Sequence, residues 1–202
     1  MAEGEAAVAV DDENDVPFEA PERGSAEELL DAGAHAPIDA MRHSAAHVMA
    51  EAVLDLFPGA RLGIGPSIEN GFYYDFELPR PLAPVDLEAI EGRMRASVAA
   101  DHAFVSREVG FDEGRAIEEG DGQAFKVEIL DDLARKARES GEPMPLVTFY
   151  EHGPFRDLCK GPHVDSTGHI GPFKLLAVAG AYWRGDEKRP MLQRIYGTVW
   201  ET

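Results

Sequence analysis

The sequence has 202 residues, a hydrophobic content of 44% and a formal net charge of −19. These values fit a globular protein with a packed core, and the longest apolar stretches, such as residues 175–182, are far shorter than the roughly 20 residues that span a bilayer. The first residues lack the basic and apolar regions of a secretory signal, and the single cysteine, Cys159, cannot form an internal disulfide. We therefore expect a cytoplasmic protein without a membrane span.

The negative charge is concentrated at the beginning of the chain. Residues 1–40 contain 12 acidic residues and one basic residue, Arg23, which leaves 26 acidic and 18 basic residues for positions 41–202. Residues 1–38 are predicted to form a disordered acidic tail. Ser25 and Glu28 form a capping-box pattern that is compatible with a short helix over residues 25–32, but a solvated linker is the preferred interpretation. Residues 39–202 are predicted to form the folded domain, whose moderate charge does not exclude a nucleic acid partner.

Helical and extended patterns alternate in the first half of this domain. Apolar residues at helical spacing predict a helix over residues 39–57, which Pro58 and Gly59 end. Extended runs over residues 61–68 and 72–76 flank the turn signal Asn70-Gly71 and predict a hairpin. A second helix is predicted from Pro84 to about residue 98, followed by a strand over residues 104–109.

The second half of the domain is predicted to be mainly extended. A third helix is predicted over residues 123–139, and strands over residues 146–151, 173–183 and 191–200, with Gly and Pro in the gaps. The fold class is therefore predicted as α+β, with helices packed on an antiparallel β-sheet.

Two histidines on the first predicted helix are the first candidates for chemistry. His43 and His47 are four residues apart, so both project from one face of the helix. Such spacing also occurs between structural or merely exposed histidines. A zinc protease needs Glu directly after the first histidine as its general base, and Ser44 occupies that position, which excludes the peptidase interpretation.

A second cluster places Cys159 four residues before His163, in a loop that contains Gly161 and Pro162. Taken alone, these are a buried structural cysteine and a loop histidine. Combined with the histidine pair, they give four soft or borderline ligands, which indicates either a tetrahedral zinc site or a polar hydrolytic pocket. The phosphate-loop pattern is absent, so ATP binding is not predicted.

Four sequence blocks carry a resemblance to a known family. They are His43-Ser44-Ala45-Ala46-His47, residues 64–75 (IGPSIENGFYYD), residues 157–163 (DLCKGPH), and residues 179–186 (AGAYWRGD) with 191–198 (MLQRIYGT). In this order they resemble the editing domain, or second additional domain, of bacterial-type threonyl-tRNA synthetases, which is related to the alanyl-tRNA editing domains. The resemblance covers roughly residues 40–200 and implies the α+β fold of that domain type.

The activity that the resemblance implies is hydrolysis of seryl-tRNA mischarged on the threonine acceptor. A site that accepts threonine cannot strongly reject serine, because the missing methyl group changes binding by only about 1–3 kcal/mol. A second, smaller site must therefore remove the error. The resemblance implies that His43, His47, Cys159 and His163 line this site, where a histidine positions or deprotonates the water that attacks the aminoacyl ester.

Other residues enter by the same resemblance. Lys126 would hold the adenosine end or the developing oxyanion, and Asp157 would orient neighbouring groups or bind the substrate amine. Tyr74 and Arg184 would contact the substrate. Taken alone, Lys126 is typical of a solvated helix lysine and Asp157 of a turn carboxylate. Candidates for tRNA contact, which also fit ordinary surface charge, are Lys160, Lys174, Arg184, Lys188, Arg189 and Arg194.

The metal content and the wider context stay open at this point. Alanyl-type editing domains hold zinc with the same four residue types, whereas the threonyl type is thought to need no cofactor, so zinc at His43, His47, Cys159 and His163 is an alternative. We expect no ligase core in this chain, which is then part of a longer synthetase or a freestanding monomeric editor. The alternatives are a zinc-dependent alanyl-type trans-editing hydrolase and a non-catalytic fragment that binds tRNA or protein.

Overall fold

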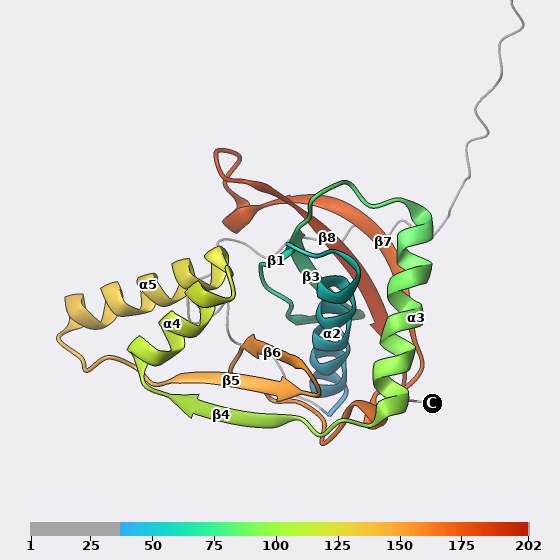
Figure 1. Cartoon of the computed structure of the whole chain (residues 1–202), viewed down its shortest axis with the longest axis horizontal. Helices are drawn as coiled ribbons and strands as arrows, with labels where there is room; N and C mark the ends of the chain where they lie inside the picture. Colours follow the sequence, from blue (N-terminus) through green and yellow to red (C-terminus); the bar gives the residue numbers. More distant parts are fainter. Residues whose placement is uncertain (1–36, 202) are drawn as a thin grey trace, which may run out of the picture.

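The computed structural model describes residues 37–201 (Figure 1). The capping-box segment over residues 25–32 and almost all of the predicted acidic tail lie outside the described residues. Among the described helices, none combines the length and the apolar composition that crossing a membrane requires.

Two antiparallel sheets make up the β structure. The first has the strand order β1-β3-β8-β7, with β2 also paired to β3, and the second has the order β4-β5-β6. The strands of the first sheet are β1 (Arg61–Leu62), β2 (Ser67–Ile68), β3 (Gly71–Glu77), β7 (Phe173–Tyr182) and β8 (Met191–Val199). The strands of the second sheet are β4 (Val105–Val109), β5 (Val147–His152) and β6 (Phe155–Leu158).

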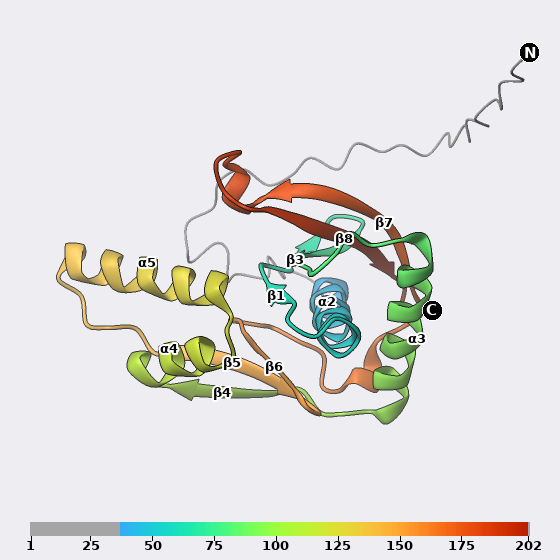
Figure 2. The same cartoon turned by 45° about the horizontal axis from the view of Figure 1, so that its top comes forward.

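The helix α2 (Pro37–Leu56) lies at the centre of the molecule, between the two sheets and beside α3 (Pro84–Ala100) (Figures 1 and 2). Every residue from His43 to Ala50 is buried, as expected for a helix that is surrounded on several sides. The helices α4 (Phe111–Gly120) and α5 (Ala124–Ser140) pair with each other at the end of the second sheet that is farther from α3. Short 3-10 turns precede β7 (η1, Thr167–His169) and follow it (η2, Trp183–Gly185).

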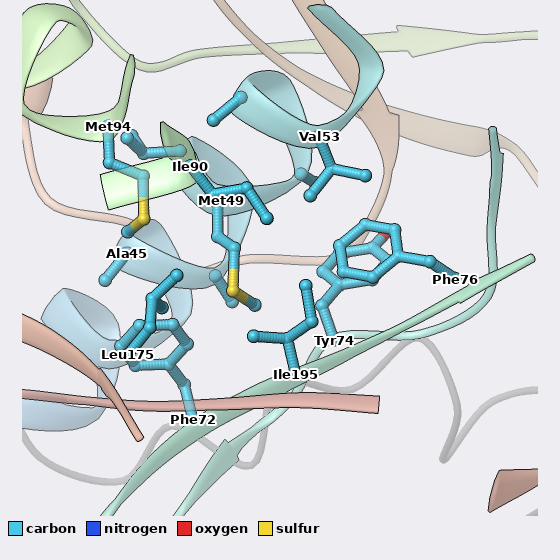
Figure 3. Close-up of a cluster of buried hydrophobic side chains, with 14 of the residues drawn as sticks. Ala45, Met49, Val53, Phe72, Tyr74, Phe76, Ile90, Met94, Leu175 and Ile195 are labelled. Carbon is cyan, nitrogen blue, oxygen red and sulfur yellow. The ribbon is translucent and has the colours of Figure 1, made fainter. Parts of the chain in front are cut away.

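Strand β3 separates two hydrophobic cores, because successive side chains of a strand point to opposite faces. Tyr74 belongs to the first core and Tyr73 to the second. Figure 3 shows the first core, where α2, α3, β3, β7 and β8 meet. Its labelled side chains are Ala45, Met49, Val53, Phe72, Tyr74, Phe76, Ile90, Met94, Leu175 and Ile195.

The α+β prediction is confirmed, and the structure adds three features to it. The strands form two sheets instead of one, and β6 pairs with β5 just before the predicted Cys/His loop. The turn between β2 and β3 is formed by Glu69 and Asn70, one residue earlier than the Asn70-Gly71 signal suggested. Helix α4 was not predicted, because two glycines and four acidic residues in ten positions hide its buried face of Phe111, Gly114 and Glu118.

Candidate active site

The structure brings the four predicted Cys and His residues together. His43 and His47 come from the buried face of α2, while Cys159 and His163 lie in the loop that follows β6. One potential ligand atom from each residue lies within 4.8 Å of those from the other three. The two sequence motifs therefore form one cluster, which we call the His/Cys cluster.

Hydrogen bonds to Nδ1 fix the orientation of two of the imidazoles. The Nδ1–H of His43 donates to the carbonyl oxygen of Pro162 at 3.1 Å. Ser44 donates its hydroxyl proton to the Ala40 carbonyl at 2.8 Å, so at 3.0 Å it accepts the Nδ1–H of His163. In the neutral form of each ring, Nε2 then carries a lone pair and no proton. Ser44, which excluded the protease motif, has this orienting role.

Both Nε2 atoms point at the thiol. Cys159 Sγ lies 3.4 Å from Nε2 of His43 and 3.4 Å from Nε2 of His163, and it accepts the backbone N–H of Gly161 at 3.0 Å. Burial is the main reason that the pKa of the Cys159 thiol is raised. A thiol has one proton and can satisfy only one of the two acceptors, so the other Nε2 lone pair stays available.

The remaining histidine of the cluster is His47. Burial, and then the proximity of His163 and His43, lowers its pKa well below the usual range, and burial similarly lowers the pKa of His163. His47 Nε2 lies 3.6 Å from Oδ2 of Asp157, and within the described part of the chain its buried Nδ1 has no hydrogen-bond partner. His47 and His163 are thus neutral imidazoles, each with a ring nitrogen that can accept a proton.

Next to the cluster lies a buried ion pair. Lys126 Nζ, from α5, is 2.7 Å from Oδ1 of Asp157, at the end of β6, and each side chain is 3% exposed. Tyr74, from β3, donates its hydroxyl to Oδ2 of Asp157 at 2.5 Å, and the Lys126 ammonium lies 5.6 Å from the centre of the Tyr74 ring. Three side chains from three separate elements therefore form one polar unit.

The position of Tyr74 depends on a glycine. A Cβ atom at Gly65 would lie 2.0 Å from Cδ2 of Tyr74, far inside van der Waals contact. Gly65 belongs to the residue 64–75 block, so the sequence signal for this close approach is the Gly-Pro pair that precedes β2.

The donor set of the His/Cys cluster fits zinc. Ligand atoms around a tetrahedral zinc lie about 3.3–3.8 Å apart, and the two Sγ to Nε2 separations of 3.4 Å match this value. The Nδ1 hydrogen bonds of His43 and His163 are of the kind that orient zinc-bound imidazoles. Four protein ligands would fill the tetrahedral shell, whereas a catalytic zinc keeps one position for water.

The predicted basic residues are mostly paired with carboxylates. Arg184, in η2, contacts Asp132 and Glu128 of α5, so its observed contacts are with that helix and not with the His/Cys cluster. Arg194 forms a bidentate pair with Asp75, at 2.7 and 2.8 Å, and is 6% exposed. Among the other candidates, Lys174 pairs with Glu91, Arg189 pairs with Glu128, and Lys160 and Lys188 are exposed.

Two buried ionisable residues near the site were not identified from the sequence. His152, at the end of β5, hydrogen-bonds Glu51 at 3.1 Å and packs against Phe155, whose ring also contacts His47. Glu118, on the unpredicted α4, is 4% exposed and lies near Lys126 and Asp157. Neither belongs to a recognised block, so no sequence signal distinguished them from solvated residues.

The fold and the cluster together define a class of protein. Residues 147–196, which include β5, β6, the Cys/His loop and β7, match the family described as the threonyl and alanyl tRNA synthetase second additional domain. The predicted resemblance to the editing domain of threonyl-tRNA synthetases is thereby confirmed at the level of the domain.

Similar proteins point to the threonyl branch of this class. The chain is 50% identical over 185 residues to a threonine–tRNA ligase of Solidesulfovibrio magneticus, covering 92% of this chain and 27% of that protein. It is 53% identical to a threonine–tRNA ligase of Nitratidesulfovibrio vulgaris and 54% identical to one of Dehalococcoides mccartyi, each over 80% of this chain. The chain spans about a quarter of the length of the curated relatives it matches.

Proposed function

We propose that this chain is a proofreading domain that hydrolyses seryl-tRNA formed on the threonine acceptor. The observation that carries the proposal is the convergence of the His/Cys cluster and the Tyr74–Asp157–Lys126 unit in one buried site. The similarity of the chain to threonine–tRNA ligases supports the choice of tRNA as partner and of serine as the amino acid to be removed. The reaction needs no ATP and no ligase core.

The nucleophile is water, and the base is an imidazole. Either His43 or His163, whichever Nε2 the Cys159 proton leaves unoccupied, accepts a proton from the water molecule as its oxygen attacks the ester carbonyl. The Nδ1 hydrogen bonds hold both rings in the tautomer that this step requires. The protonated imidazole then returns the proton to the ribose oxygen as the ester bond breaks, so that tRNA and serine are released.

The polar unit of Tyr74, Asp157 and Lys126 supplies the charged groups for the reaction. The Lys126 ammonium stabilises the negative charge that develops on the carbonyl oxygen, because it is fixed in place before the reaction and screened from water. Asp157 holds Lys126 and Tyr74 and attracts the α-ammonium group of the substrate. Tyr74, whose pKa is raised first by burial and then by Asp157, stays protonated and keeps Asp157 oriented.

A zinc-dependent editor of the alanyl type is the second candidate, favoured by the fit of the His/Cys cluster to zinc. In that case His43, His47, Cys159 and His163 would hold the ion, and it would supply Lewis-acid chemistry only when one of the four gives its position to water or to the carbonyl oxygen. The residues around the cluster would keep the same roles, since Lys126, Asp157 and Tyr74 are outside it.

The test is deacylation of seryl-tRNA and threonyl-tRNA, both on the threonine acceptor, with and without a chelator. We expect selective hydrolysis of the seryl ester, unchanged by the chelator and strongly reduced by His43→Ala and His163→Ala. The substitution His169→Ala, at an exposed histidine of η1, is the matched control and should keep the wild-type rate. Chelator-sensitive deacylation of aminoacyl esters on the alanine tRNA would favour the zinc-dependent alanyl-type editor. Binding of aminoacyl-tRNA without hydrolysis would overturn both candidate functions.

A further inference from the structure

Helix α4 places a carboxyl group in the interior beside the proposed site. Glu118 is 4% exposed, and its carboxyl group forms no hydrogen bond or ion pair with any of residues 37–201. It lines a cavity of about 570 Å³ whose other polar lining residues include Gln123, Arg156 and Asp157. The cavity is thus lined both by Glu118 and by Asp157, the acidic partner of the ion pair.

The charged groups around Glu118 come from four elements. Lys126 is on α5, Arg156 and Asp157 are on β6, Asp121 caps the end of α4, and Glu151 of β5 lines the same cavity. Lys126 and Asp157 already neutralise each other at 2.7 Å, and Arg156 donates to Asp121 at 2.5 Å. An ionised Glu118 would therefore add an uncompensated negative charge to a buried region, which is costly.

These surroundings favour the neutral acid form of Glu118. Burial is the main reason that the pKa of Glu118 is raised to about 8; Asp157 and Asp121 raise it further, while Lys126 and Arg156 oppose the shift. At neutral pH the carboxyl group then keeps its proton, and the site has no net charge from Lys126, Asp157 and Glu118 together.

The proposed substrate changes this balance. An aminoacyl ester carries an α-ammonium group, and Asp157 is its anionic partner in the proposed function. A positive charge that arrives beside Asp157 favours the charged form of any nearby carboxyl group. Glu118 is the buried carboxyl group that is available to respond, because Asp157 is already paired with Lys126 at 2.7 Å.

We propose that Glu118 is a positioning residue that compensates the charge of the substrate's ammonium group by releasing one proton when the substrate binds. This inference rests on the proposed function. The O–H bond of the Glu118 carboxyl group breaks, its electron pair stays on the carboxylate, and the proton passes to water in the cavity and to the buffer. The ammonium keeps its protons, and the negative charge of the Glu118 carboxylate offsets the added positive charge.

The test measures protons released on binding of a stable analogue, the 3′-amide of serine with 3′-amino-3′-deoxyadenosine. Calorimetric titration in two buffers with different heats of ionisation gives the number of protons exchanged. We expect the wild-type chain to release about one proton more per ligand bound than Glu118→Gln at neutral pH. Glu119→Gln, at an exposed neighbour on the same helix, should match the wild type, and Glu118→Asp should keep most of the release.

A second ligand isolates the role of the ammonium group. The analogue in which a hydroxyl group replaces the α-amine should bind with the same proton count to the wild type and to Glu118→Gln. Infrared difference spectra of the unliganded chain should show a protonated carboxyl band at neutral pH that Glu118→Gln lacks and that disappears when the serine analogue binds.

The outcomes separate this inference from the proposed function. Equal proton counts for the wild type and Glu118→Gln, with selective seryl-tRNA hydrolysis intact, would overturn the role of Glu118 and leave the proposed function standing. Absence of analogue binding by every variant, together with absence of deacylation, would overturn both. A Glu118→Gln chain that releases fewer protons, with a thermal midpoint no lower than that of the wild type, would support the inference, because misfolding could not explain the change.

Discussion

Lys126 and Asp157 form a buried ion pair with an Nζ to Oδ1 distance of 2.7 Å, and each side chain is 3% exposed. Removing one partner leaves the other charge buried and unpaired, so Lys126→Met should reduce the free energy of unfolding by about 3–5 kcal/mol. The double variant Lys126→Met/Asp157→Asn should lose less than the sum of the single variants. Urea unfolding of the four chains measures the coupling, and additive losses would contradict a buried pair.

The absence of a side chain at Gly65 leaves space for the ring of Tyr74. In Gly65→Ala the new Cβ would lie 2.0 Å from Tyr74 Cδ2, so the ring must move away from Asp157. We expect a loss of about 1–3 kcal/mol in unfolding free energy, as for other overpacked sites, and slower deacylation of seryl-tRNA. Denaturant unfolding and initial rates measure the two effects.

The control for that substitution lies in α3. Gly92 is exposed, and nothing lies within 4 Å of a Cβ added there, so Gly92→Ala should stabilise the chain by about 0.5–1 kcal/mol through helix propensity. If both glycine variants behaved alike, the contact between Gly65 and Tyr74 would not limit the site.

The sequence predicted the parts of the site that depend on local geometry or on a recognised block. The helical period placed His43 and His47 on one face, and the four blocks indicated that Cys159 and His163 join them, which agrees with the structure. The burial of Lys126 could not be read locally, because a lysine on an amphipathic helix is usually solvated and its partner Asp157 lies on a distant strand. Pairing of that kind is decided by tertiary packing.

Helix α4 and Glu118 show a second limit of prediction from the sequence. Acidic side chains and glycine dominate residues 111–120, so the apolar period of the helix is weak, and the helix is held by packing against α5 and β5. Because the element itself was not predicted, its buried carboxyl group could not be distinguished from the many solvated acidic residues of this chain.

Two of the basic residues proposed for tRNA contact should separate into different roles. Arg194→Ala leaves Asp75 buried and unpaired and removes a guanidinium that lies 3.8 Å from the centre of the Tyr73 ring, so it should cost about 3–5 kcal/mol of stability. Lys160→Ala, at an exposed position beside Cys159, should change stability by less than about 0.5 kcal/mol.

For binding of threonine tRNA we expect the opposite ranking of the two variants, with the larger effect from Lys160→Ala. The Lys160→Ala chain should bind more weakly and lower the slope of log affinity against log salt concentration by about 1, as expected for the loss of one phosphate contact. The Arg194→Ala chain, assayed where it is still folded, should keep the wild-type slope. Salt titrations monitored by fluorescence anisotropy measure both, and a changed slope for Arg194→Ala alone would reverse the assignment.

The His/Cys cluster should bind added zinc, whether or not the reaction uses it. A ligand that binds only the native state stabilises it by about 2.7 kcal/mol at a hundredfold excess over Kd, so the thermal midpoint should rise with zinc and return to its starting value with a chelator. His163→Ala should lose most of this shift, whereas His169→Ala should keep it. Equal shifts in both variants would mean that zinc binds elsewhere.

The pH dependence of stability gives a test of Glu118 that needs no substrate. Its pKa is about 8 in the folded chain and about 4.3 in an unfolded one, so between these values the native state binds more protons than the unfolded state. Stability from this group is therefore complete below about pH 4 and is lost as the pH rises towards 8, with a slope near −1.4 kcal/mol per pH unit.

Other groups titrate in the same range, among them His47 and His163, whose lowered pKa values make stability rise with pH up to about 6.5. The quantity to measure is therefore the difference in unfolding free energy between Glu118→Gln and the wild type, from urea titrations at several pH values. This difference should shift in favour of Glu118→Gln by about 1.4 kcal/mol per pH unit between pH 5 and pH 8, because the wild-type carboxyl group loses stability as the pH rises and glutamine carries no charge. A difference that is constant with pH would mean that Glu118 is ionised in the folded chain at neutral pH, with a stabilising partner in place of its buried proton.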